Sequence, residues 1–265
     1  MMETEQIDTT SAKTALGSEE LKGMRALFAC PTYGPVDPEC ARDQRVEIMT
    51  SAKHGLEWAG DTSTDRMGYG PARNHVCNRL YVEPGLADGV MWMDSDIRTH
   101  GGAVTQLLHS VRKFEADFVS GIYHQRGGTF LPVFYHFNDE AGKFQHYVNY
   151  PENSLLPVDG CGFGFVWTSL KLIQAIADSP DFDRKAGWFP DNRDSGGFGE
   201  DLSFCQQASK VGVQLYVNTA VQVGHLGEPE VIGKAHFEEA QERRKEEGFV
   251  EPLKARQWGV KDDWV

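Results

Sequence analysis

The alternation of strand-like and helix-like segments is the feature that most constrains this fold. Three apolar runs of strand length, MRALFAC (24–30), GLEWAG (55–60) and DGVMWM (88–93), are each followed by a segment with helical spacing of apolar residues. The helical segments are ECARDQRVEIMTSAKHG (39–55), PARNHVCNRLYVE (71–83) and GAVTQLLHSVRKF (102–114). Three strand–helix repeats predict a parallel α/β sheet in the first half of the chain.

The second half of the chain has a different pattern of predicted elements. Short strand-like pieces separated by turns occur at 116–123, 129–137, 143–150 and 155–168, and a helix follows at 201–212. One or two further strands are expected over 213–225, and a charged helix over 234–248. This pattern predicts a mixed α+β half that continues the same sheet, in one domain, because no internal repeat or long linker divides the chain.

Composition excludes several classes of protein. A net charge of −13 over 265 residues disfavours a broad contact with nucleic acid or an anionic membrane. Apolar runs fall well short of the roughly 20 residues that a spanning helix needs, so no membrane insertion is expected. The polar, acidic start lacks the features of a signal peptide, which predicts a disordered leader and a cytoplasmic protein. Five widely spaced cysteines without a C-x-x-C pair are expected to be buried free thiols.

Asp94 and Asp96 follow the third apolar run directly, in VMWMDSDIRTH. In an extended segment their side chains point to the same side, so both carboxylates could meet one Mn²⁺ or Mg²⁺ ion that bridges a diphosphate. The loops after all three strands, PTYGP, DTSTDR and DSDIRTH, should converge at the carboxyl edge of a parallel sheet, where such folds bind ligands. The alternative is that these aspartates form a turn or cap a helix.

Two further segments carry candidate chemistry. GGFGEDLSF delivers Glu200 and Asp201 to the start of a helix, where a carboxylate can act as a general base or simply stabilise the helix dipole. VQVGHLG places His225 between glycines after a strand, as a ligand for Mn²⁺ or as a packed residue.

Glycines alternate with apolar residues in VDGCGFGFVWTSLKL. Gly162 lies at the centre of this run, which predicts either a backbone surface against which a flat ligand lies or a glycine-bearing strand with a bulge. The run does not fit a dinucleotide fingerprint, because Trp167 stands where the third glycine is needed.

In this order, the segments resemble those of GT-A fold glycosyltransferases of the family 2-like type. The matching text is ACPTYGP, ARN (72–74), MWMDSDI, SGIYHQR, VDGCGFGFVWTSL, GFGEDLSFCQQASKVG and VGHLG, which together span about Met24 to Gly227. The resemblance implies a single GT-A domain over 23–227, with a mixed central sheet and a Rossmann-like N-terminal half. Residues 1–22 would be the leader, and 228–265 a C-terminal helix and tail.

The resemblance also implies roles for individual residues. Pro31, Thr32 and Tyr33 would line the nucleotide pocket, with Arg73, Asn74 and Ser95 near the donor. Asp94 would contact ribose, or the metal through water, while Asp96 and His225 would bind the metal. Asp201 would remove the acceptor proton in an inverting enzyme, with Glu200 supporting it. The stereochemical outcome stays open, because retaining branches share these motifs.

The acceptor has two candidate classes, a sugar or lipid-linked glycan and a hydroxylated pyrimidine in phage DNA. Trp188 and Phe189, in RKAGWFPDNRDSGGFG, would stack on the acceptor beside basic residues, or form a hydrophobic lid over the donor. A viral member would work in the cytoplasm of the host cell. The tryptophans Trp258 and Trp264 would pack back on the domain or form a homodimer contact.

Two rival functions need to be separated from glycosyl transfer. A haloacid-dehalogenase-like phosphatase also places D-x-D after a strand, but on the first strand and with Thr or Val where this chain has Arg98. A non-catalytic nucleotide-sugar-binding module would bind UDP with metal and show no turnover.

Overall fold

The structure is a computed structural model that describes residues 20–62, 64, 66–227 and 231–246. Most of the expected leader and the tail that carries Trp258 and Trp264 lie outside the described residues. Leu21, within the segment expected as leader, is fully buried, and its backbone N–H donates to the His54 carbonyl at 2.9 Å. The described chain therefore contributes to the core before the first strand begins.

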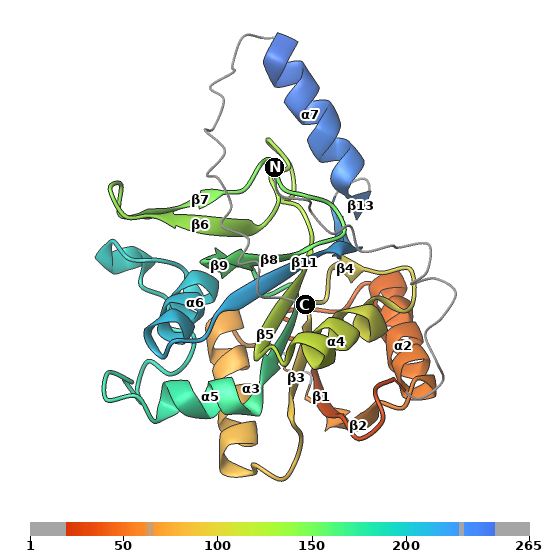
Figure 1. The fold of residues 1–265 in the computed structure, drawn as a ribbon, viewed down its shortest axis with the longest axis vertical. Coiled ribbons are helices and arrows are strands. Elements are labelled where there is room, and N and C mark those ends of the chain that lie inside the picture. The colour runs from red at the N-terminus through yellow and green to blue at the C-terminus, as the bar shows by residue number, and fades with distance from the viewer. Residues whose placement is uncertain (1–19, 63, 65, 228–230, 247–265) are drawn as a thin grey trace, which may run out of the picture.

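A seven-stranded mixed sheet forms the centre of the molecule (Figure 1). Its strand order is β2-β1-β3-β10-β5-β11-β8. The strands are β1 (Arg25–Ala29), β2 (Glu57–Asp61), β3 (Gly89–Met93), β5 (Phe118–Ile122), β8 (Leu155–Val158), β10 (Phe165–Ser169) and β11 (Leu215–Gln222).

The directions of the strands confirm the predicted fold class. β1 pairs in parallel with both β2 and β3, which gives the parallel N-terminal half. β10 then lies antiparallel between β3 and β5, and β8 lies antiparallel to β11 at the edge. The second half thus continues the same sheet with mixed direction, as the change in sequence pattern predicted.

Helices cover both faces of this sheet (Figure 1). α3 (Tyr69–Val82), α5 (Leu170–Ala177) and α6 (Glu200–Lys210) contact one another on one face. α2 (Pro38–Lys53) and α4 (Ala103–Phe114) pair on the other. The fully buried Glu47 of α2 accepts the backbone N–H groups of Ala103 and Val104 at 3.2 and 3.0 Å, which caps the first turn of α4.

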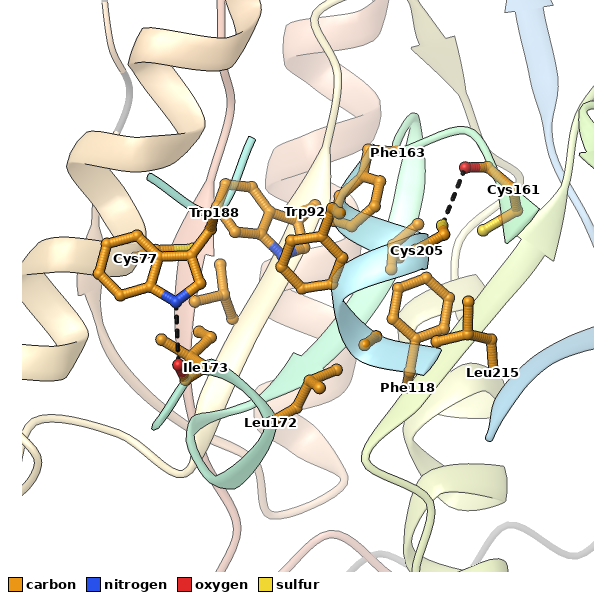
Figure 2. Packing of buried hydrophobic residues seen from close by; sticks show 14 of the residues in the cluster. Cys77, Trp92, Phe118, Cys161, Phe163, Leu172, Ile173, Trp188, Cys205 and Leu215 are labelled. Atoms are coloured by element: carbon orange, nitrogen blue, oxygen red, sulfur yellow. Dashed lines mark hydrogen bonds between the residues drawn. The ribbon is translucent and has the colours of Figure 1, made fainter. Parts of the chain in front are cut away.

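Large aromatic side chains fill the core beneath α3, α5 and α6 (Figure 2). Trp92 of β3 is fully buried, and its indole N–H donates to the Thr168 hydroxyl at 2.8 Å. Trp188 is buried as well and donates to the Ile173 carbonyl at 2.9 Å. Buried indoles need such partners, because an unpaired N–H in an apolar core costs free energy of about 1–3 kcal/mol.

Two small sheets lie beside the central one. β12 (Gly224–Leu226) pairs with β13 (Val231–Ile232) and with β4 (Ile97–Arg98), a two-residue strand within the segment predicted as a loop. The hairpin of β6 (Phe134–Asn138) and β7 (Lys143–His146) pairs with β9 (Gly160–Cys161). α7 (Lys234–Glu246) follows β13 and projects from the body (Figure 1).

The cysteines agree with the expectation from the sequence. All five cysteines are free and buried. In the part of the chain that the structure describes, no helix is long and apolar enough to cross a membrane.

Candidate functional site

The loops after β1 and β2 lie side by side at the carboxyl edge of the sheet. Pro31 and Thr64 form an isolated parallel bridge, and the Thr32 backbone N–H donates to the Thr64 carbonyl at 3.0 Å. Pro31 and Thr32 are buried, whereas the Tyr33 side chain is 70% exposed. Of the three residues predicted to line a nucleotide pocket, Tyr33 is the one that presents a free ring.

The short strand β4 brings Asp96 and His225 together across about 130 residues of sequence. β4 pairs Ile97 with His225 of β12, and the Leu226 backbone N–H donates to the Asp96 carbonyl at 2.8 Å. As a result, His225 Nε2 lies 3.5 Å from Asp96 Oδ2. The sequence pattern placed each residue after a strand, and the pairing of the short strands β4 and β12 makes them neighbours.

The imidazole of His225 is held in one orientation. Its Nδ1 lies 2.8 Å from the carbonyl oxygen of His124, an acceptor, so Nδ1 carries a proton. In the neutral ring, Nε2 then directs a lone pair toward the Asp96 carboxylate. Two electron-pair donors that face each other in this way need a proton or a cation between them. Asp96 and His225 therefore fit a divalent cation such as Mn²⁺, for which both are common ligands.

The charge state of Asp96 suits this role. Burial acts to raise the pKa of Asp96, but the hydrogen bond and charge that His225 supplies when its ring is protonated, together with the charge of Arg126, outweigh it, so the pKa lies below its usual value. Arg126 donates to Asp96 Oδ2 at 2.5 Å. The carboxylate is therefore ionised and already surrounded by positive charge.

Asp94 faces a different partner. Its two oxygens accept from Arg73 at 3.2 and 3.1 Å, and its side chain is therefore committed to that guanidinium. In the described part of the chain, no group of three or more His, Cys, Asp or Glu residues is placed to hold a metal ion. The predicted three-residue set is thus reduced to the pair of Asp96 and His225, and Asp94 is a residue beside that pair.

Arg73 is the centre of the site. Its side chain is only 2% exposed, yet it bridges the two carboxylates predicted for donor and acceptor, since Nη1 donates to Asp201 Oδ1 at 2.5 Å while Nη2 binds Asp94. Glu200 lies 3.7 Å from the same Nη1. The face of the guanidinium contacts the rings of Tyr69, Phe163 and Phe189, with 5.4, 5.4 and 5.7 Å between the Arg73 Cζ and the ring centroids.

The surroundings change the acidity of both bridged carboxyl groups. Burial raises the pKa of Asp94 to about 7, although the charge of Arg73 acts in the opposite direction. Burial also raises the pKa of Asp201, again against the charge of Arg73. A carboxylate with a raised pKa is a stronger base than one in water, which is a property expected of a group that removes a proton near neutral pH.

Asp201 lies at the start of α6, where the sequence placed it. The second oxygen, Oδ2, accepts the Phe163 backbone N–H at 3.2 Å, so both oxygens are oriented. The side chain is still 28% exposed, and a carboxylate has about four acceptor positions. Asp201 can therefore accept one further hydrogen bond from a hydroxyl group that approaches the site.

Several residues predicted to contact ligands have structural roles instead. Trp188 and Phe189, predicted to bind the acceptor, belong to the buried core, where their rings pack against other side chains. The Asn74 side-chain amide binds the Ala186 carbonyl and the Phe189 N–H, at 3.1 and 2.9 Å, and so fixes this segment to α3.

Gly162 is also buried, and its position is set by packing. A Cβ atom at residue 162 would lie 2.1 Å from the Tyr123 hydroxyl oxygen and 2.7 Å from Val133 Cγ1. The glycine therefore allows Tyr123 to approach the backbone, and it does not present a surface to a flat ligand.

Four site residues were not predicted as such. Tyr69 and Tyr123 have pKa values raised chiefly by burial and secondly by nearby carboxylates, Asp94 for Tyr69 and Asp201 for Tyr123. His124 orients His225 through its carbonyl, and Arg126 binds Asp96. The sequence signal for Tyr123, His124 and Arg126 was their presence in SGIYHQR, at the end of a buried strand.

Comparisons with known proteins give similarity of fold. Neither a protein-family model nor a curated protein matches the sequence. Among solved structures, the chain is similar to A197 from STIV, with a TM-score of 0.49 and 18% identity over 77% of this chain and 86% of that one. It is also similar to GalNAc-T7 solved with UDP, GalNAc and Mn²⁺, with a TM-score of 0.46 and 9% identity over 76% of this chain and 44% of that one. At these identities the similarity concerns the fold alone.

Proposed function

We propose that this protein is a metal-dependent glycosyltransferase that moves a hexose or pentose from a nucleotide-diphosphate sugar, with UDP as the preferred carrier, to an acceptor hydroxyl group. The observation that supports it most is the Nε2–Oδ2 pair of His225 and Asp96, 3.5 Å apart, at the carboxyl end of β3. A buried arginine beside it carries two more carboxylates. The arrangement combines a cation-binding pair with a candidate base.

The donor is proposed to bind across the loops after β1 and β3. The exposed ring of Tyr33 is available to stack on the nucleotide base, and the buried Pro31 and Thr32 precede it in the same loop. Asp96 and His225 would hold Mn²⁺ or Mg²⁺, and such an ion, when bound, neutralises charge that develops on the departing diphosphate. Ser95 and Asp94 lie next to this position, with Asp94 fixed by Arg73.

Asp201 is proposed to act on the acceptor. It would accept the proton of the attacking hydroxyl while Arg73 and the Phe163 N–H hold it in place. Arg73 also keeps Asp201 and Asp94 from repelling each other. Glu200, 3.7 Å from Arg73, would support the same arrangement. This role corresponds to inversion of configuration at the sugar, and the stereochemistry of the product tests it.

The acceptor is proposed to be the hydroxyl group of a glycan. The hypothesis of a DNA base rested on stacking by Trp188 and Phe189, and both rings are buried. The net charge of −13 also opposes a polyanionic acceptor.

The phosphatase alternative requires Asp94 to attack a phosphate as a nucleophile. Both Asp94 oxygens are bound by a buried guanidinium, and the motif follows the third strand of the chain. A measurement of sugar transfer distinguishes an enzyme from a non-catalytic binding module, which would bind the nucleotide-sugar without turnover.

The test begins with a screen of nucleotide-sugars for protection against thermal unfolding, with and without Mn²⁺, because a bound ligand raises the unfolding temperature. Asp96→Ala should abolish metal-dependent UDP binding in calorimetry. Asp201→Asn should keep that binding and lose sugar transfer. Unchanged UDP binding in the first variant, or near-normal transfer in the second, would contradict the corresponding role.

A further inference from the structure

Arg126 occupies a position that the predicted roles do not explain. It donates to Asp96 Oδ2 at 2.5 Å, and the same oxygen lies 3.5 Å from His225 Nε2. The Arg126 side chain is nevertheless 52% exposed, so its guanidinium has donors left for another partner. An arginine beside a cation-binding pair can bind the same anionic ligand as the metal ion that this pair would hold.

The loop that carries Arg126 is anchored at its base and open at its tip. The Gln125 backbone N–H donates to the Leu131 carbonyl at 2.9 Å, which closes the loop. At the tip, Gly127 and Gly128 have φ values of 72° and 66°, and a Cβ added at either would contact nothing within 4 Å. Arg126 therefore lies between the fixed base and the open tip of this loop, with its half-exposed side chain on Asp96.

Two other arginines near the carboxyl edge, Arg73 and Arg98, are already committed. Arg73 is buried with its guanidinium bound to Asp94 and Asp201. Arg98 is bound to Asp43, with 2.7 Å between Nε and Oδ2, and to Glu39. Of these three arginines, Arg126 alone is exposed enough to reach a ligand.

We infer that Arg126 is a diphosphate-binding residue that turns from Asp96 to the donor when a divalent cation occupies the pair of Asp96 and His225. This inference rests on the proposed function and names how the site recognises the diphosphate. Guanidinium groups bind diphosphate oxygens with two parallel hydrogen bonds, and the surrounding carboxylates make such a positive charge necessary.

The two roles of Arg126 have opposite effects on the two ligands. Without a donor, the guanidinium competes with the metal for Asp96 Oδ2 and repels it. With a donor, the guanidinium leaves Asp96 and adds hydrogen bonds to the diphosphate. Removing the charge should therefore tighten the binding of Mn²⁺ alone and weaken the binding of the nucleotide diphosphate. A purely structural role for Arg126 would move both affinities in the same direction or neither.

Isothermal titration calorimetry of the full chain tests this with Mn²⁺ alone, and then with UDP at saturating Mn²⁺. For Arg126→Gln we expect Mn²⁺ to bind about threefold more tightly, from the repulsion of two charges in a largely solvated site. UDP should bind about tenfold more weakly, from the loss of charge-assisted hydrogen bonds. Arg126→Lys keeps the charge and should retain wild-type Mn²⁺ affinity with an intermediate affinity for UDP.

Arg25→Gln is the matched control, because it removes an exposed arginine paired with Glu57 at 2.9 Å at the opposite end of β1. Neither affinity should change in this variant. Inorganic pyrophosphate should show the same dependence on Arg126 as UDP, since the diphosphate is the group bound.

If the affinities for Mn²⁺ and UDP are unchanged in Arg126→Gln, or both fall together, the inference about Arg126 is overturned. Binding of UDP and Mn²⁺ by the wild-type protein would still support the proposed function in that case. Wild-type protein that binds neither Mn²⁺ nor UDP overturns the proposed function and the inference together.

Discussion

Removal of the Arg73 side chain is the most demanding perturbation of this site. In Arg73→Met, Asp94 and Asp201 lose the cation that joins them, with Glu200 also nearby. Methionine fills a similar volume, so the main loss is electrostatic. The folded state is left with partly buried carboxylates that repel one another, which is the situation in which breaking an ion pair costs most.

The magnitude follows from the contacts. Arg73 makes one hydrogen bond of 2.5 Å to Asp201 and two of 3.1 and 3.2 Å to Asp94. Hydrogen bonds to charged groups contribute about 1.5–3 kcal/mol each, and breaking a buried pair costs about 3–5 kcal/mol. Because Asp94 and Asp201 keep some exposure and regain water, we expect the lower end, a loss of about 3 kcal/mol in the free energy of unfolding.

Urea unfolding followed by circular dichroism measures this loss at several pH values. Without Arg73, the pKa values of the carboxyl groups in the folded state rise further above their unfolded values. The folded state then binds more protons, so stability falls as pH rises above about 4. The variant should be less destabilised at pH 5 than at pH 8, and Asp94→Asn in the same chain should restore about 1 kcal/mol at pH 8. A loss below about 1 kcal/mol with no pH dependence would refute this account of Arg73.

Three further changes have defined outcomes. His124 is buried with no hydrogen-bond partner for either ring nitrogen among the described residues, and burial lowers its pKa to about 4. The unfolded state therefore binds more protons, and the free energy of unfolding falls by up to about 3 kcal/mol as the pH is lowered from about 6.5 to about 4. His124→Phe should remove that slope in urea titrations, and an unchanged slope would contradict it. Trp188→Phe should lose about 2 kcal/mol of stability with the hydrogen bond to Ile173, while donor and acceptor binding by calorimetry stay at wild-type values. Gly162→Ala should lower the unfolding temperature through the clash with the Tyr123 hydroxyl, at a cost of about 1–3 kcal/mol, and a wild-type temperature would show that Tyr123 yields.

Local patterns were sufficient to predict most of the fold. The apolar run before Asp94 is a central strand, so all of its side chains are buried and the signal is strong. β4 was missed because two residues have no periodicity to detect, and their pairing depends on a strand about 130 residues later.

Within the site, the sequence indicated which residue types gather but not which of them face each other. Asp94 and Asp96 alternate along the chain as expected, yet one turns to Arg73 and the other to His225. Trp188 was assigned to a ligand because large aromatics near a basic segment suit both a stacking surface and a core. Its burial follows from packing against α3 and α5, which no local pattern reports.

The position of β10 has a consequence for how the chain folds during synthesis. β10 separates β3 from β5, although both precede it in sequence by more than 40 residues. Until residue 169 has emerged, β3 and β5 each keep an unpaired edge lined with apolar side chains. Such edges associate with other chains, and pairings distant in sequence form slowly. Fragments that end before β10 should therefore aggregate, and chaperone binding during translation should be strongest between the completion of β5 and the arrival of β10.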